Sequence, residues 1–244
     1  MSPEKLPELF IKSASRRTRQ LQAMFAPPGN VALYFQPLVS LGARRIIGFT
    51  AHSVRPGDEV LRAACRAAAR WPDGITLGVE LTAERWRNPT AGLQVYSALS
   101  ECGLSPARLE LEIPEEALAD DTGPAQHTIE HVRRSGVMVA LTGCGRAAET
   151  AAPMSGFDTI KFGAAFAQRL GHDAQSDMIA EALIRVADQY GVVTAADGIS
   201  SDAQIDILTA KGCAEGQGSL FGKPVRASEI PALLHYPSIA DATA

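Results

Sequence analysis

Polar side chains stand at the ends of several apolar runs, and their types decide what chemistry the chain could perform. They are three carboxylates, one lysine, one amide and two hydroxyls, at Thr50, Glu80, Glu112, Thr142, Lys161, Asp197 and Gln217. Hydrolysis of a phosphoester by two metal ions requires several anionic oxygen ligands, one of which bridges the ions. This set could hold one Mg²⁺ weakly, and it is poor for a pair of cations.

Strand-like apolar runs alternate with helical patterns along most of the chain. The predicted strands cover residues 31–39, 45–50, 75–81, 109–113, 137–141, 159–162, 192–196 and 213–217. Helical patterns cover residues 60–71, 89–102, 124–134 and 176–190, and a capping-box pattern opens another helix at Ser201. This alternation favours an α/β fold, a TIM-like (β/α)8 barrel whose functional residues lie at the carboxyl ends of the strands.

The first two strands are expected to be antiparallel. Only a short turn at Gly42 joins them, and a parallel crossover needs far more chain. An open, doubly wound sheet is the alternative architecture. It is disfavoured because no glycine-rich phosphate loop follows the first strand.

The chain divides into three predicted parts. Residues 1–28 have helix-like apolar spacing, and a Pro-Pro-Gly-Asn sequence at 27–30 ends that pattern. Residues 29–231 form the predicted barrel, and residues 232–244 form a C-terminal tail. The basic residues of the first part, Lys12, Arg16, Arg17 and Arg19, are interpreted as a solvated helix face rather than as a nucleic-acid or membrane patch.

Composition narrows the class of protein. The 244 residues are 46% hydrophobic, enough for a full core, and the net charge of -4 gives no basic field for nucleic acid. The four cysteines form no C-x-x-C pair, and neither a secretory leader nor a membrane-spanning run is evident. We therefore expect a cytoplasmic protein with reduced thiols, in which Cys144 is a buried residue and not a nucleophile.

Three segments carry a resemblance to a known family. They are residues 34–39 (YFQPLV), 109–113 (LELEI) and 212–224, which closes with QGSLFGKP. Their order and context resemble the EAL family of cyclic di-GMP phosphodiesterases over nearly all of residues 31–226. The resemblance implies an EAL-type barrel with a site for the dinucleotide and divalent cations at the strand ends.

Several family positions for metal and phosphate contacts are altered. The resemblance places the glutamate of the naming tripeptide at Thr50 and a phosphate-binding arginine at Val54, where Arg55 could substitute with a shift. The paired aspartates that bridge the cations fall at Thr142 and Gly143. The segment between Arg55 and the next helix is also shorter than usual, which implies a more open pocket.

Other positions are retained or conservatively changed. By the same resemblance, Glu112 matches a ligand glutamate, and Lys161 matches the lysine that positions the attacking water. Glu80 replaces an asparagine ligand, Asp197 replaces a glutamate, and Gln217 matches the glutamine of the closing motif. The residual metal candidates are therefore Glu80, Glu112 and Asp197.

Each retained residue also has a purely structural interpretation. Glu112 and Lys161 could form a buried ion pair at the barrel mouth. Gln36 and Gln217 could satisfy loop backbone groups, and Glu80 and Asp197 could be solvated acids. His52 is interpreted as a packed or exposed residue rather than as a ligand.

Three functions remain open from the sequence. The first is a catalytically inactive EAL-like module that regulates through protein–protein interaction, with no cofactor. The second is a nonhydrolysing receptor that grips cyclic di-GMP through Gln36, Arg55, Lys161 and Gln217. The third is a weak phosphodiesterase with residual catalytic residues Glu112 and Lys161, which would need Mg²⁺ at the residual metal site. A monomer and a homodimer are equally compatible with the sequence.

Overall fold

The computed structural model describes residues 33–53, 58–118, 122–145 and 156–235. The predicted helix at 1–28 and the candidate ligand Arg55 therefore lie outside the described residues. No helix among the described residues is long and apolar enough to cross a membrane.

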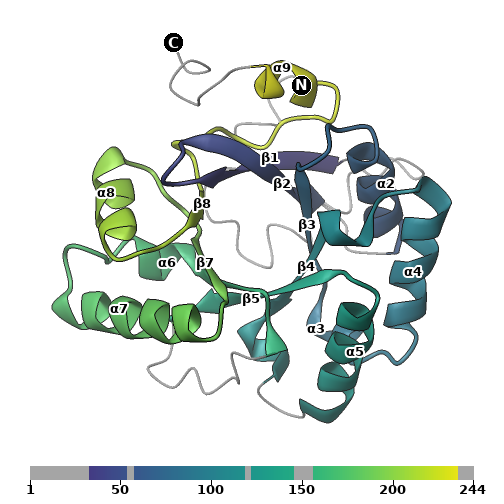
Figure 1. Ribbon diagram of the computed structural model, residues 1–244, viewed down its shortest axis with the longest axis horizontal. Helices are drawn as coiled ribbons and strands as arrows, with labels where there is room; N and C mark the ends of the chain where they lie inside the picture. Colours follow the sequence, from purple (N-terminus) through teal and green to yellow (C-terminus); the bar gives the residue numbers. More distant parts are fainter. Residues whose placement is uncertain (1–32, 54–57, 119–121, 146–155, 236–244) are drawn as a thin grey trace, which may run out of the picture.

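Eight strands close into a barrel in sequence order, as predicted. Figure 1 shows them as a ring with the helices on the outside. The strands are β1 (Leu33–Ser40), β2 (Arg45–Ser53), β3 (Thr76–Glu80), β4 (Leu109–Pro114), β5 (Met138–Cys144), β6 (Thr159–Phe162), β7 (Val193–Ala196) and β8 (Glu215–Gln217).

The orientation of β1 sets this barrel apart from one whose strands are all parallel. β1 runs antiparallel to both β2 and β8, and every other neighbouring pair is parallel. The expected antiparallel first pair is thus confirmed. Because Leu33 is the register partner of Ser53, β1 begins beside the carboxyl end of β2.

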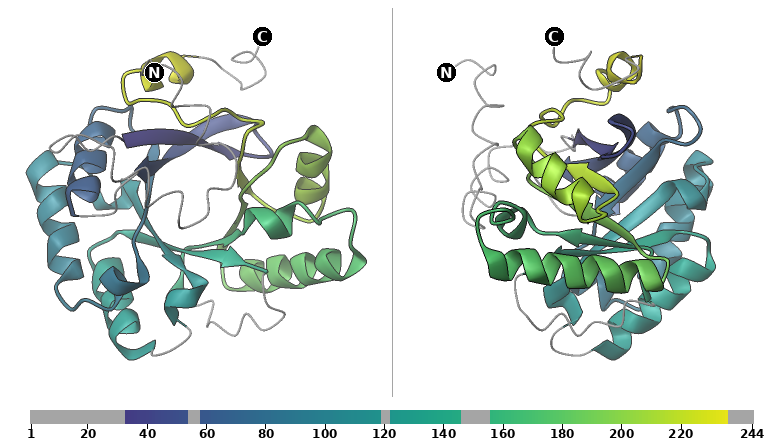
Figure 2. Two further views of the ribbon diagram at one scale, coloured as in Figure 1. Left: turned by 180° about the vertical axis from the view of Figure 1, so that it is seen from behind. Right: turned by 60° about the vertical axis from the view of Figure 1, so that its left-hand side comes forward.

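Helices cover the outside of the barrel on most sides (Figures 1 and 2). The α-helices are α2 (Asp58–Ala68), α3 (Ala83–Trp86), α4 (Ala91–Cys102), α5 (Thr122–Arg134), α6 (Ala164–Ala167), α7 (Ala174–Gln189), α8 (Asp202–Ala210) and α9 (Ile230–Leu234). Two 3₁₀ turns, η3 (Pro106–Arg108) and η4 (Glu115–Leu118), flank β4.

Capping side chains explain where two of these helices begin. The Asp173 carboxylate accepts hydrogen bonds from the backbone N–H groups of Gln175 and Ser176, so α7 starts two residues before the predicted position. The predicted capping box of α8 is present, with Ser201 and Gln204 each bonding the other's backbone. The short helix α3 was missing from the sequence prediction, because four residues are too few for an apolar period to show.

Side chains along each strand point alternately toward the surrounding helices and toward the centre of the barrel, and these two regions differ in polarity. On β4, Leu109, Leu111 and Ile113 face the helices and belong to one large apolar core, and all three are fully buried. Glu110 and Glu112 point the other way, into the barrel, and they too are buried. The apolar core therefore lies between sheet and helices, and the barrel itself has a polar centre.

The last described helix lies over the outside of β1 (Figure 1). Ile230 is fully buried, and Leu233 and Leu234 pack against the core. The helix α9 thus runs across the predicted boundary, at which the barrel ends with residue 231 and the C-terminal tail starts with residue 232.

Candidate functional site at the mouth of the barrel

The carboxyl ends of the parallel strands meet at one end of the barrel, which we call the mouth. Register brings the predicted residues together there: Glu80 pairs with Glu112, and Thr142 pairs with Lys161. Gln36 lies opposite Thr50. The sequence-predicted residues outside the undescribed segment at 54–57 thus line one surface.

Lys161 makes the central interaction of the mouth. Its Nζ donates a hydrogen bond to Glu112 Oε1 at 2.7 Å and lies 2.5 Å from Glu110 Oε1. Only 1% of the Lys161 side chain is exposed. Glu110 Oε1 and the ammonium group form a buried ion pair. One ammonium group therefore contacts two buried glutamates and offsets part of their negative charge.

Hydroxyl groups complete this cluster. Thr159 donates a hydrogen bond to Glu110 Oε2 at 2.8 Å, and Thr50 donates to Glu112 Oε1 at 3.4 Å. Gly78 leaves room for the second glutamate, because a Cβ atom there would lie 2.8 Å from Glu112 Oε1. The carboxylate that the resemblance identifies as a metal ligand is thus already held by a lysine and a threonine.

Charges around Lys161 fix its protonation. Burial lowers the pKa of the Lys161 ammonium, but the neighbouring Glu112 and Glu110 carboxylates outweigh this effect and raise the pKa above its ordinary value. Lys161 is therefore a permanent cation at neutral pH. In that state it has no free lone pair with which to accept a proton from water.

Two further carboxyl groups in the barrel have raised pKa values. Burial and the nearby charge of Glu112 raise the pKa of Asp197 to about 7, although part of its surface still contacts solvent. Burial and the charge of Glu110 raise the pKa of Glu215 to about 7. The barrel thus holds more carboxyl groups than its single lysine can neutralise, and part of this excess is protonated near pH 7.

The amides of the mouth are bonded to each other. Gln217 Nε2 donates to Gln36 Oε1 at 3.2 Å, and Gln36 Nε2 donates to the carbonyl oxygen of Gly222 at 3.3 Å. Gln36 thus satisfies a loop carbonyl, as one interpretation of the sequence expected. A ligand that used either amide would have to displace these bonds.

The remaining predicted residues are more exposed. Glu80 is exposed at the end of β3, and Asp197 follows β7 with part of its surface in solvent. His52 is exposed at the end of β2. Cys144 is buried, and burial raises the pKa of its thiol to about 12, so it is not poised as a nucleophile.

The end of β5 lacks anionic oxygens. Thr142 donates its hydroxyl to the carbonyl oxygen of Ile113 at 3.4 Å, and Gly143 follows with a positive φ of 83°. Among the described residues, no group of three or more histidine, cysteine, aspartate or glutamate side chains is arranged to hold a metal ion. The donors present at the mouth therefore do not fit a site for two divalent cations.

Sequence reasoning missed the inner layer of the barrel. Glu110, Thr159 and Glu215 lie one strand step below Glu112, Lys161 and Gln217, and they contact or influence the residues above them. The two-residue period of a strand could have revealed them, because residues i and i−2 share a face.

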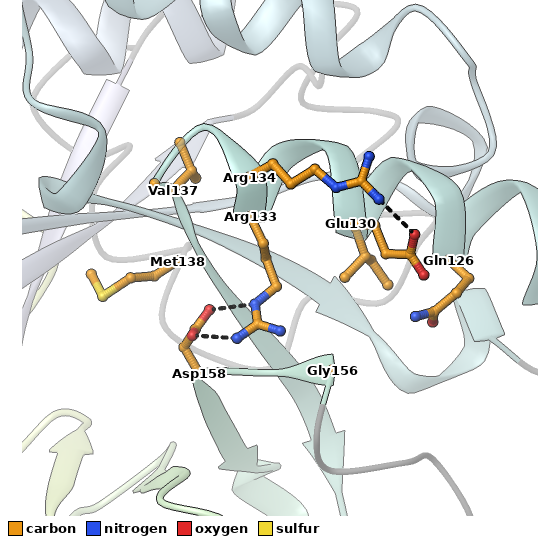
Figure 3. Close-up of a pocket in the computed structure, with 10 residues that line it drawn as sticks. Gln126, Glu130, Arg133, Arg134, Val137, Met138, Gly156 and Asp158 are labelled. Carbon is orange, nitrogen blue, oxygen red and sulfur yellow. Dashed lines mark hydrogen bonds and ion pairs between the residues drawn. The ribbon is translucent and has the colours of Figure 1, made fainter.

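A pocket of about 460 Å³ opens at the other end of the barrel, where α5 meets the start of β5 and β6 (Figure 3). Two arginines line it, and both are paired with carboxylates. Arg133 Nη2 lies 2.9 Å from Asp158 Oδ1, and Arg134 Nη2 lies 3.5 Å from Glu130 Oε2. The first pair ties α5 to the residue that precedes β6, whereas the second lies within α5 itself.

The sequence profile of the EAL domain family matches residues 57–224, which is more than half of the chain. The chain belongs to the EAL domain family. The family assignment made from the motifs is thus confirmed.

Individual curated proteins and solved structures are similar to this chain. The uncharacterized protein y4lL of Sinorhizobium fredii is 33% identical over 180 residues, which are 73% of this chain and 22% of that protein. The structure of the Pseudomonas aeruginosa MucR phosphodiesterase in complex with cyclic di-GMP has a TM-score of 0.76 at 23% identity, and covers 88% of this chain and 97% of that one.

A third relative was solved with both a metal and the dinucleotide. The manganese and cyclic di-GMP complex of Klebsiella pneumoniae BlrP1 has a TM-score of 0.74 at 20% identity, and covers 82% of this chain and 57% of that one. Identities this low show the shared fold alone. This chain spans about a fifth of the length of the first curated relatives.

The lysine cluster gives a first prediction about stability. Lys161→Met leaves Glu110 and Glu112 buried without their cation, and should destabilise the folded state by about 3–5 kcal/mol in urea unfolding. Adding Glu110→Gln and Glu112→Gln to that variant should recover much of the loss. A loss below about 1 kcal/mol in Lys161→Met would contradict the central role of the ammonium group.

The raised carboxyl pKa values give a second prediction. Between about pH 4 and pH 7, folded Asp197 and Glu215 bind protons that the unfolded chain has released, so stability should fall as pH rises through this window. Asp197→Asn and Glu215→Gln should each reduce the loss of unfolding free energy with rising pH, which is at most about 1.4 kcal/mol per pH unit for one group. Asp202→Asn, on the exposed start of α8, is the matched control. If it changed the pH dependence of stability as much as the other two variants do, Asp197 and Glu215 would not be its source.

Proposed function

We propose that this EAL domain does not hydrolyse cyclic di-GMP, and that it serves as a regulatory module that binds another protein. One observation carries the first half of this proposal. Glu112, which the family resemblance assigns to a cation, is bonded instead to the ammonium group of Lys161. A divalent ion at that carboxylate would have to sit beside a buried positive charge.

The altered strand ends support the same conclusion. Metal-assisted hydrolysis needs bound cations to lower the pKa of water and to neutralise charge that develops on the phosphate. Thr50, Thr142 and Gly143 provide no anionic oxygen for this purpose. Loss of metal activation costs many orders of magnitude in rate, because each 1.36 kcal/mol of barrier is about tenfold.

Exposed apolar side chains support the second half of the proposal. Met178 on α7 is 68% exposed, Val186 on the same helix is 38% exposed, and Tyr190 at the C-cap of α7 is 61% exposed. On α4, Leu93 and Tyr96 are 65% and 64% exposed, one helical turn apart. Exposed large apolar side chains, aromatic ones above all, are typical of surfaces that bind proteins.

A receptor for cyclic di-GMP is the second candidate function. Gln36, Gln217 and Lys161 all lie at the mouth, and the fold resembles that of the MucR phosphodiesterase, which was solved in complex with cyclic di-GMP. Lys161 is fully engaged with glutamates, however, so a phosphate could recruit it only by breaking a buried ion pair. This cost favours the regulatory module over the receptor.

The proposal predicts no turnover. The full chain incubated with cyclic di-GMP and either Mg²⁺ or Mn²⁺ should release no linear dinucleotide above the rate of a metal-free control, as measured by chromatography. A Glu112→Ala variant should behave identically. Linear product that forms with the native chain and vanishes in Glu112→Ala would show that the residual site is catalytic.

Calorimetry distinguishes a regulatory module that does not bind cyclic di-GMP from a receptor that does. Titration of the full chain with cyclic di-GMP should give no saturable heat in the micromolar range, which corresponds to binding free energies of about −8 kcal/mol. Gln36→Ala and Gln217→Ala serve as variants that open the amide pair. Saturable binding of the native chain that either variant weakens would transfer the assignment to the receptor.

A further inference from the structure

Two histidines lie one turn apart on the exposed side of α5. His127 and His131 are both exposed, with ring centroids 6.4 Å apart and ring planes inclined by 20°. Residues four apart on a helix share a face, so the two rings lie next to each other on the surface of α5. Neither ring takes part in the ion-pair network at the mouth.

The neighbouring helix positions one of the two rings. Figure 1 shows α4 and α5 side by side on the outside of the barrel. A Cβ atom at Gly92 of α4 would lie only 2.5 Å from Cδ2 of His131, so the absence of a side chain makes room for the imidazole. His131 therefore rests against α4, and the exposed His127 is free to turn toward it.

Imidazole nitrogens are preferred ligands of borderline divalent cations such as Zn²⁺, Ni²⁺ and Cu²⁺. Two histidines at positions i and i+4 of one helix can share an ion, with each metal–nitrogen distance near about 2.0–2.1 Å. The 6.4 Å between ring centroids must shorten for this, and rotation about χ1 of the exposed His127 can move its ring toward His131.

We propose that His127 and His131 form a two-ligand site for a borderline first-row divalent cation, with water in the remaining coordination positions. The nearest acidic residue in sequence, Glu130, is paired with Arg134 at 3.5 Å. The described residues offer no cluster of three or more such ligands, so water completes the shell. The site is independent of the mouth, whose carboxylates would instead suit hard cations such as Mg²⁺.

Calorimetric titration of the metal-free full chain with NiCl₂ tests this site. We expect one Ni²⁺ per chain. His127→Gln and His131→Gln should each weaken binding by about tenfold or more, because either change leaves one donor and removes the chelate. His172→Gln, an exposed histidine away from α5, should leave the affinity unchanged. MgCl₂ should give no binding that depends on these two histidines.

Other results would overturn the site. Equal affinity in the native chain and both α5 variants, or a loss in only one of them, would mean adventitious metal only. One Ni²⁺ per two chains would replace the water-completed site with one that bridges copies. The variants should fold normally and leave the cyclic di-GMP assays unchanged, so failure here is distinguishable from failure of the proposed function.

Discussion

A single buried ammonium group holds the polar centre of this barrel together. Lys161 reaches inward from β6 and contacts Glu110 and Glu112, two residues apart on β4. Strands β4 and β6 are not neighbours, since β5 lies between them, so the ion pair spans the interior rather than a ladder of backbone bonds. Without this cation, two carboxylates would face each other in a space largely closed to water, at a cost of several kcal/mol.

The balance of charge inside the barrel follows from this arrangement. Lys161 cannot also neutralise Asp197 and Glu215, and burial raises the pKa of both carboxyl groups to about 7. In a metal-loaded site, cations would supply the missing positive charge and keep such acids ionised. Here a lysine supplies part of that charge, and bound protons on the two carboxyl groups supply another part.

Much of the fold could be predicted from the sequence because its signals are local. The alternation of apolar runs, the short turn at Gly42 and the capping residue Ser201 each specify structure over a few residues. The family motifs then placed Glu112 and Lys161 at one end of the barrel, and the register of the strands agrees. The pairing of these two residues was one of two interpretations that the sequence left open.

The rest depended on contacts that the sequence does not encode locally. Glu110 and Lys161 are 51 positions apart, and only the barrel register decides that they meet. The raised pKa of Asp197 arises from burial, which no motif reports. The i, i+4 spacing of the two histidines on α5 can be read from the sequence. The space that Gly92 leaves for His131 depends on how α4 and α5 pack.

The reversed first strand has a consequence for how this domain is joined to its surroundings. Since Leu33 lies beside Ser53, the polypeptide enters the barrel at the rim of the mouth and not at the opposite end. A parallel first strand would have placed that junction behind the sheet, far from the polar centre. Leu33 and the polar side chains of Glu80 and Asp197 therefore share one end of the domain, so the first described residue of the chain belongs to the same rim as the strand-end carboxylates.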